Sequence, residues 1–97
     1  MQIKKVILAT DEEYAPRHEA LLSSLYERGI ELFCAWGRHS GQWELAMDLF
    51  VTDPVRFDES RHVTTTSHSD ESFEDVLNMA QCWSVEDGSN DVEVIRL

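Results

Sequence analysis

Two short apolar runs, separated by an amphipathic stretch, constrain the fold of this chain more than any other feature. The runs lie within residues 3–10 and 30–36, and continuous apolar runs of this length are typical of strands buried on both faces of a sheet. The stretch between them, residues 15–28, has Pro16 near its start, leucines at helical spacing, and Gly29 directly after it. The first part of the chain therefore predicts a strand, a helix and a second strand.

The middle of the chain predicts a second helix and a third strand. After the glycine-flanked turn 37–41, apolar residues recur at helical spacing, namely Trp43, Ala46, Met47, Phe50 and Val51. Pro54 marks the end of this helix. Residues 62–68 are polar but rich in β-branched side chains, which favour a strand.

The last third predicts one more helix and one more strand. Ser72 and Asp75 have the spacing of a capping box, and an apolar helix face follows, made of Phe73, Val76, Leu77, Ala80 and Trp83. Residues 92–97 alternate with period two, as expected of a half-exposed edge strand.

These elements predict one α/β domain over residues 1–97 with the order βαβαβαβ. We expect three layers, with a mainly parallel four-stranded sheet covered by helices on both faces, in a Rossmann-like or flavodoxin-like arrangement. A chain of 97 residues has the size of a single domain. The order of the strands in the sheet stays open at this stage.

The charge is strongly negative and concentrated in one part of the chain. There are 8 Lys and Arg residues against 19 Asp and Glu, a formal net charge of −11. Residues 70–93 contain no Lys or Arg and eight acids, namely Asp70, Glu71, Glu74, Asp75, Glu86, Asp87, Asp91 and Glu93. Such a surface repels phosphate backbones and anionic lipid and attracts basic proteins. We therefore expect a basic protein partner, no nucleic acid and no membrane.

Other sequence features favour a cytoplasmic protein without a cofactor. No apolar run approaches the roughly 20 residues that span a bilayer, and acids at 11–13 stand where a signal peptide would continue its apolar region. The chain has no glycine-rich nucleotide-binding motif and no Cys-x-x-Cys. Cys34 and Cys82 are expected to be buried free thiols, and Trp43 and Trp83 to be core residues.

Polar residues follow three of the predicted strands, where open α/β sheets bind their ligands. These loops, 11–14, 37–40 and 68–71, bring together Asp11, Arg38, His39, His68 and Asp70. One alternative hypothesis is therefore a small ligand-binding protein or a hydrolase, with a histidine acting as base for a serine. Acids after a strand are more often helix caps than metal ligands, so no metal site is predicted.

Several motifs between residues 30 and 85 resemble a family of small uncharacterised bacterial proteins. The family shares an Ala-Trp-Gly, a helix with a Trp and an Asp five positions after it, and a Thr-Thr-x-His-x-Asp-Glu segment. The corresponding stretches here are Ala35-Trp36-Gly37, Trp43 with Asp48, Arg61-His62-Val63-Thr64-Thr65, His68-Ser69-Asp70-Glu71 and Phe73-Glu74-Asp75-Val76. The resemblance implies an α/β fold and a bacterial origin but no activity. Ser67 stands where such relatives tend to carry an aromatic residue, which argues against an aromatic-lined pocket at that position.

The small size, acidity and tryptophan content are also similar to immunity proteins that neutralise bacterial toxins, including those of contact-dependent growth inhibition. The leading hypothesis is accordingly a protein that is not an enzyme but blocks a basic toxin nuclease. Its expected partner-binding residues are Asp70, Glu71, Glu74, Asp75, Glu86, Asp87, Trp36 and Arg38. A third hypothesis is a dimeric accessory protein that pairs through the edge strand 92–97.

Overall fold

The computed structural model describes residues 3–54, 62–85 and 90–97, and these residues form one parallel sheet with helices on both faces. The strands are β1 (Lys5–Ala9), β2 (Leu32–Trp36), β3 (Thr64–His68) and β4 (Glu93–Arg96). Each neighbouring pair of strands runs parallel. The predicted α/β fold with its mainly parallel four-stranded sheet is confirmed.

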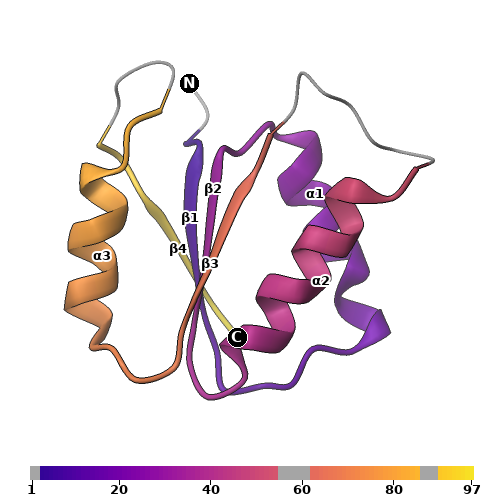
Figure 1. Ribbon diagram of the computed structural model, residues 1–97, viewed down its shortest axis with the longest axis horizontal. Coiled ribbons are helices and arrows are strands. Elements are labelled where there is room, and N and C mark those ends of the chain that lie inside the picture. The colour runs from indigo at the N-terminus through magenta and orange to yellow at the C-terminus, as the bar shows by residue number, and fades with distance from the viewer. Residues whose placement is uncertain (1–2, 55–61, 86–89) are drawn as a thin grey trace.

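Three helices and a short 3-10 turn connect the strands. They are η1 (Pro16–His18), α1 (Glu19–Glu27), α2 (Ser40–Thr52) and α3 (Phe73–Cys82). Helices α1 and α2 cover one face of the sheet and α3 covers the other, as Figure 1 shows. The side chain of Ser72 accepts a hydrogen bond of 3.1 Å from the backbone N–H of Asp75, so the predicted helix cap is present. None of the helices in the described part of the chain has the length and apolar content needed to span a bilayer.

The strand order, which the sequence left open, is β3-β2-β1-β4. The chain moves outward from β1 to β3 through α1 and α2, then returns through α3 to place β4 on the other side of β1. This is the order of a Rossmann half-sheet and not the flavodoxin order. Strand β4 lies at one edge of this sheet, as predicted for residues 92–97.

The core has two parts, one on each face of the sheet. All five residues of β1 are buried, and their side chains alternate between the faces. Val6 and Leu8 pack in the cluster that contains Trp43 and Met47 of α2. Ile7 belongs to the smaller cluster against α3, together with Leu32, Cys34, Val76 and Ala80. Burial on both faces explains why the first strand is a continuous apolar run.

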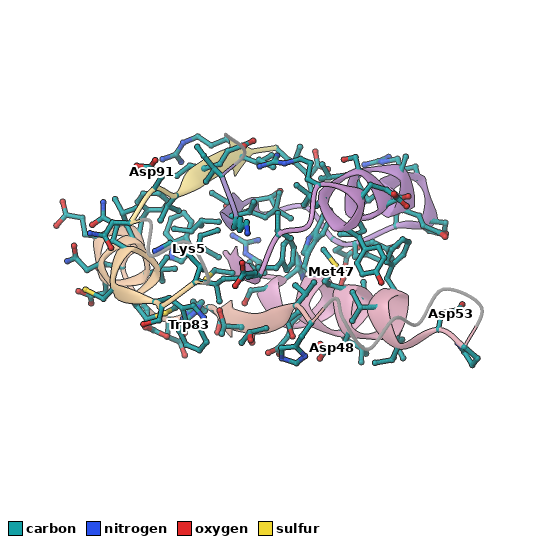
Figure 2. The ribbon with its side chains drawn as sticks, turned by 90° about the horizontal axis from the view of Figure 1, so that it is seen from above. Lys5, Met47, Asp48, Asp53, Trp83 and Asp91 are labelled. Atoms are coloured by element: carbon teal, nitrogen blue, oxygen red, sulfur yellow. The ribbon has the colours of Figure 1, made fainter. Side chains whose placement is uncertain are left out.

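Lys5 is a fully buried residue of β1 that sequence reasoning did not single out. Its Nζ donates hydrogen bonds of 3.0 Å to the backbone carbonyls of Gln81 and of Trp83. These carbonyls end helix α3, where the helix dipole favours a positive charge. Figure 2 shows Lys5 in the interior and Trp83 at the outside near the end of α3. Lys5 thus joins the first strand to the last helix.

Two core predictions at the end of α3 are wrong. Trp83 is 37% exposed, because α3 ends at Cys82 and the extended backbone of Trp83 (φ −67°, ψ 130°) takes its ring off the helical face. Cys82 is exposed because it follows the buried Ala80 by two residues, which places it about 200° around the helix. Trp43 and Cys34 are buried as predicted.

Candidate functional site

The loops after β1 and β2 are bound to each other at the carboxyl end of the sheet, which lies at the bottom of Figure 1. The N–H of Thr10 donates to the carbonyl of Trp36 at 3.0 Å, and the N–H of Arg38 donates to Oδ1 of Asp11 at 3.2 Å. Gly37 has a φ of +135°, and a Cβ there would stand 1.9 Å from the carbonyl oxygen of Thr10. Only glycine therefore allows these two loops to approach so closely.

His68 fixes the loop after β3. Its Nδ1 lies 2.7 Å from Oε1 of Glu71, and its Nε2 lies 2.8 Å from the hydroxyl of Thr66. The His68 side chain is only 10% exposed. Both ring nitrogens thus have partners within the chain. The order of the groups, hydroxyl, imidazole and carboxylate, is that of a catalytic triad, in which the carboxylate orients the imidazole base.

The thiol nearest to this group is that of Cys34 on the neighbouring strand. Burial raises the pKa of the Cys34 thiol, while a hydrogen bond with Thr66 and the positive charge of Lys5 act in the opposite direction. Since a thiolate and not a thiol is the nucleophile, this buried cysteine is a structural residue.

The described acids of residues 70–93 fall into separate groups. Asp70 and Glu71 in the β3–α3 loop, and Glu74 and Asp75 in the first turn of α3, are all exposed at the carboxyl end of the sheet. Glu93 lies instead at the start of β4, where it forms an ion pair of 2.9 Å with Arg28. Among the described residues, the acids at the start of α3 and Glu93 at the start of β4 thus lie at opposite ends of the sheet, and the predicted Glu86 and Asp87 lie outside the described residues.

The acidic group around the start of α3 consists of Asp70, Glu71, Glu74 and Asp75, and few of its charges are paired with basic side chains. Glu71 pairs with His68, whereas Asp70, Glu74 and Asp75 form no ion pair within the described part of the chain. The N-terminus of a helix favours acidic side chains through its dipole, which accounts for their stability there without a basic neighbour.

Trp36 contacts the residues next to this acidic group. Its Nε1 donates a hydrogen bond of 2.8 Å to the carbonyl of Glu71, and its ring meets that of Phe73 edge to face at a centroid distance of 5.4 Å. The indole therefore connects the end of β2 to the β3–α3 loop and to α3.

A crevice opens between the carboxyl ends of β1 and β4. It has a volume of about 240 Å³ and is lined by Ala9, Thr10, Asp11, Trp36, Arg96 and Leu97. The strand order reverses at this point, and open α/β sheets bind ligands in such a crevice. The guanidinium of Arg96 lies 4.9 Å from the centroid of the Phe73 ring. Sequence reasoning missed Arg96, because only the pairing of Ala9 with Arg96 brings it to this position.

The remaining predicted ligand-site residues are only partly brought together. Asp11 touches the backbone of Arg38, and His39 directly precedes helix α2, but the crevice is lined by Asp11 without Arg38, His39, His68 or Asp70. Among residues 3–54, 62–85 and 90–97, no three His, Cys, Asp or Glu side chains have the arrangement of a metal site.

Comparison with known proteins identifies a family and no activity. A family model described as a domain of unknown function, DUF7684, matches residues 1–94. A search of the curated proteins and a search of the solved structures find no match. The family match agrees with the resemblance to a small uncharacterised family, and the likeness to immunity proteins stays a prediction.

Proposed function

We propose that this chain, which belongs to the DUF7684 family of domains of unknown function, is a binding module for a basic protein. The single observation that carries the proposal is the group of exposed carboxylates of Asp70, Glu74 and Asp75. None of them has an ion-pair partner among the described residues, in a protein whose formal net charge is −11. In general terms, the proposed role is to bind a basic protein through carboxylates. The specific role that we propose is that of an immunity protein, which inhibits a toxin nuclease.

The proposed mechanism requires no chemical step. The acidic group attracts a basic protein over a distance of about one Debye length, roughly 8 Å at physiological salt, and raises the rate of association. Once the partner is bound, carboxylates at the start of α3 occupy positions where a basic cleft would hold the phosphates of its substrate. Trp36 holds the backbone next to these carboxylates in place, through its hydrogen bond to the carbonyl of Glu71 and its ring contact with Phe73.

The first experiment is capture of the partner. The chain is co-expressed with the neighbouring open reading frames of its native genome, purified at low salt, and washed at high salt, with mass spectrometry of both fractions. We expect a stoichiometric basic protein that leaves at high salt, because exposed charge pairs are screened. Absence of a basic partner at either salt concentration would contradict the proposal.

The second experiment locates the contact by association kinetics with that partner. E74K/D75K is expected to slow association by about tenfold or more, and E74K alone by a smaller factor. E27K is the matched control, because Glu27 is an exposed glutamate at the end of α1 and the change in charge equals that of E74K. Equal association rates for E74K and E27K would exclude steering by the acidic group.

A second candidate function, a small ligand-binding protein or hydrolase, is favoured by two observations. One is the crevice between β1 and β4, and the other is the sequence of contacts from Thr66 through His68 to Glu71. A thermal-shift screen with nucleotides, divalent metals and amino acids tests the crevice. Hydrolysis of p-nitrophenyl acetate, compared between the unmodified chain and H68Q, tests the histidine. No shift in Tm and equal hydrolysis rates would remove this candidate.

The hypothesis of a dimer through β4 keeps one supporting feature. Within the described sheet, β4 pairs with β1 alone, so its other side is a free edge that a second copy would extend. Size-exclusion chromatography with light scattering distinguishes a dimer from a monomer.

A further inference from the structure

Helix α2 carries a second apolar stripe that its own fold does not bury. Trp43, Met47 and Phe50 face the core, as expected from the helical spacing. Leu45 and Leu49, one helical turn apart, are 58% and 63% exposed. Met47 and Asp48 point to different sides of α2 (Figure 2), Met47 into the core and Asp48 toward Thr65 of β3. The helix thus has a core side, a polar side and this exposed apolar stripe. Exposed leucines in a contiguous patch are a mark of an interaction surface.

The two leucines border an apolar groove. One hollow of about 300 Å³ is lined by Tyr14, Gln42, Leu45, Ala46 and Leu49. A second hollow of about 230 Å³ adjoins it and is lined by Tyr14, Glu19, Ala46, Leu49 and Phe50. Since both hollows share Tyr14, Ala46 and Leu49, they form one groove between α2 and the segment that enters α1.

The aromatic wall of the groove is held in place before any partner binds. The ring of Tyr14 meets Trp43 edge to face at a centroid distance of 5.2 Å, and the N–H of Tyr14 donates to the side chain of Gln42 at 3.2 Å. Trp43 is itself fixed, because its Nε1 donates to the carbonyl of Glu12 at 2.9 Å. A rigid aromatic wall lowers the entropy lost on binding.

Acidic side chains lie beside the groove, and the exposed Arg17 of the neighbouring η1 pairs with Glu12. Glu19 lines the second hollow, and its charge adds to burial, the larger cause, in raising the pKa of the Tyr14 phenol. Glu44 and Asp48 extend along the other side of α2, where they accept hydrogen bonds from Ser67 and Thr65 of β3. A second copy of this chain is a poor occupant, because each copy has a formal net charge of −11.

We propose that this groove docks an amphipathic helix of a partner protein, with apolar residues on one side and Lys or Arg on the flanks. The groove follows α2 from Gln42 to Leu49, which is seven residue steps or about 10 Å of helix. This length is enough to receive two successive apolar side chains of a partner helix lying along α2. The groove lies on the α1 and α2 side of the sheet, apart from the acidic group at α3 (Figure 1). The inference therefore adds a second contact surface to the proposed function.

A synthetic peptide tests the groove directly. The probe is a fluorescein-labelled helical peptide of about four turns, with Leu along one face and Lys elsewhere, measured by fluorescence anisotropy. We expect saturable binding to the unmodified chain and at least a tenfold weaker affinity for L45S/L49S. The control is W83Q, which changes another exposed apolar side chain, 37% exposed at the end of α3 on the opposite face of the sheet, and it should bind like the unmodified chain.

Peptide controls separate shape from charge. A peptide of the same composition with its leucines spread around the helix, and one with Glu in place of Lys, are both expected to bind at least tenfold more weakly. Methyl NMR spectra should show shifts at Leu45 and Leu49 with the probe and none at Leu97. Equal affinity for the unmodified chain and L45S/L49S would overturn the inference. A dimer in light scattering that L45S/L49S abolishes would also overturn it, since the occupant would then be a second copy.

The captured partner keeps this inference and the proposed function distinguishable. If L45S/L49S binds the partner like the unmodified chain while E74K/D75K slows association, the groove inference fails and the proposed acidic contact stands. If L45S/L49S weakens binding while E74K/D75K has no effect, the groove stands and the acidic contact fails.

Discussion

The two ends of the sheet differ in how many of their charged side chains form ion pairs. At the amino end, Lys4 pairs with Glu31 at 3.4 Å and Arg28 pairs with Glu93 at 2.9 Å, while buried Lys5 holds the end of α3. At the carboxyl end, the exposed carboxylates of Asp70, Glu74 and Asp75 and the guanidinium groups of Arg38 and Arg96 form no ion pair among the described residues.

The difference separates the charges that stabilise the fold from those that we propose bind a partner. Charges at the amino end connect elements far apart in the sequence, so they stabilise the fold. The carboxyl end is held by contacts between its loops, among them the backbone bond of Thr10 to Trp36, the Asp11 bond to the Arg38 N–H and the pair of His68 with Glu71. Asp70, Glu74 and Asp75 take no part in these contacts, and we propose that they bind the partner. Exposed carboxylates without ion-pair partners are suited to attract a protein of opposite charge.

The largest expected effect concerns the backbone of the carboxyl end. In G37A the new Cβ would stand 1.9 Å from the carbonyl of Thr10, at a φ of +135°. We expect a loss of about 3 kcal/mol or more in the free energy of unfolding, measured by urea denaturation. G29A at the amino end is the control, because Gly29 has a positive φ of +80° but no atom within 4 Å of its Cβ position. Its expected cost is about 1 kcal/mol, and equal losses would refute the close approach.

The next effect concerns the buried lysine at the amino end. K5A removes two hydrogen bonds to the end of α3 and leaves a cavity, so we expect a loss of about 2–4 kcal/mol. K4A removes only a partly exposed ion pair with Glu31 and should cost less than about 1 kcal/mol. Urea denaturation measures both variants. If K5A lowers the free energy of unfolding no more than K4A does, Lys5 does not stabilise the fold.

The smallest effect compares one arginine from each end. R28Q loses the ion pair with Glu93 and a hydrogen bond of 2.9 Å to the carbonyl of Ile3, with an expected cost of about 1 kcal/mol. R96Q loses only its position over the Phe73 ring and should cost about 0.5 kcal/mol. Thermal unfolding at low and high salt measures both, and a larger loss for R96Q would reverse the contrast between the two ends.

Sequence patterns located the helices and strands to within a few residues. The predicted strand 30–36 contains β2, and the predicted helix start at Ser72 coincides with its observed cap. Such features are local, because helical spacing, glycine stops and capping side chains act over four or five residues. The prediction failed at Trp83 for the same reason, since it continued a helical spacing beyond the point where the helix ends.

The candidate site was less predictable. The carboxyl-end loops were identified from the chain order alone, and Asp11 and Arg38 do meet there. The involvement of Arg96 depended on the pairing of β4 with β1, and that of Thr66 on the partners of His68. The first pairing leaves no signal in the sequence, because residues that meet across a sheet are chosen by the route of the connections. The second is local and could have been predicted, since Thr66 and His68 lie two residues apart on one face of β3.

The sequence by itself determined an acidic chain whose alternating strands and helices had to form a parallel sheet with two covered faces. That much follows from apolar periodicity and charge, which are properties of neighbouring residues. Only the tertiary structure decided that β4 lies beside β1, that Lys5 is buried against α3, and that Leu45 and Leu49 stay exposed. These outcomes depend on which faces meet, because burial is a property of packed elements and not of a single segment.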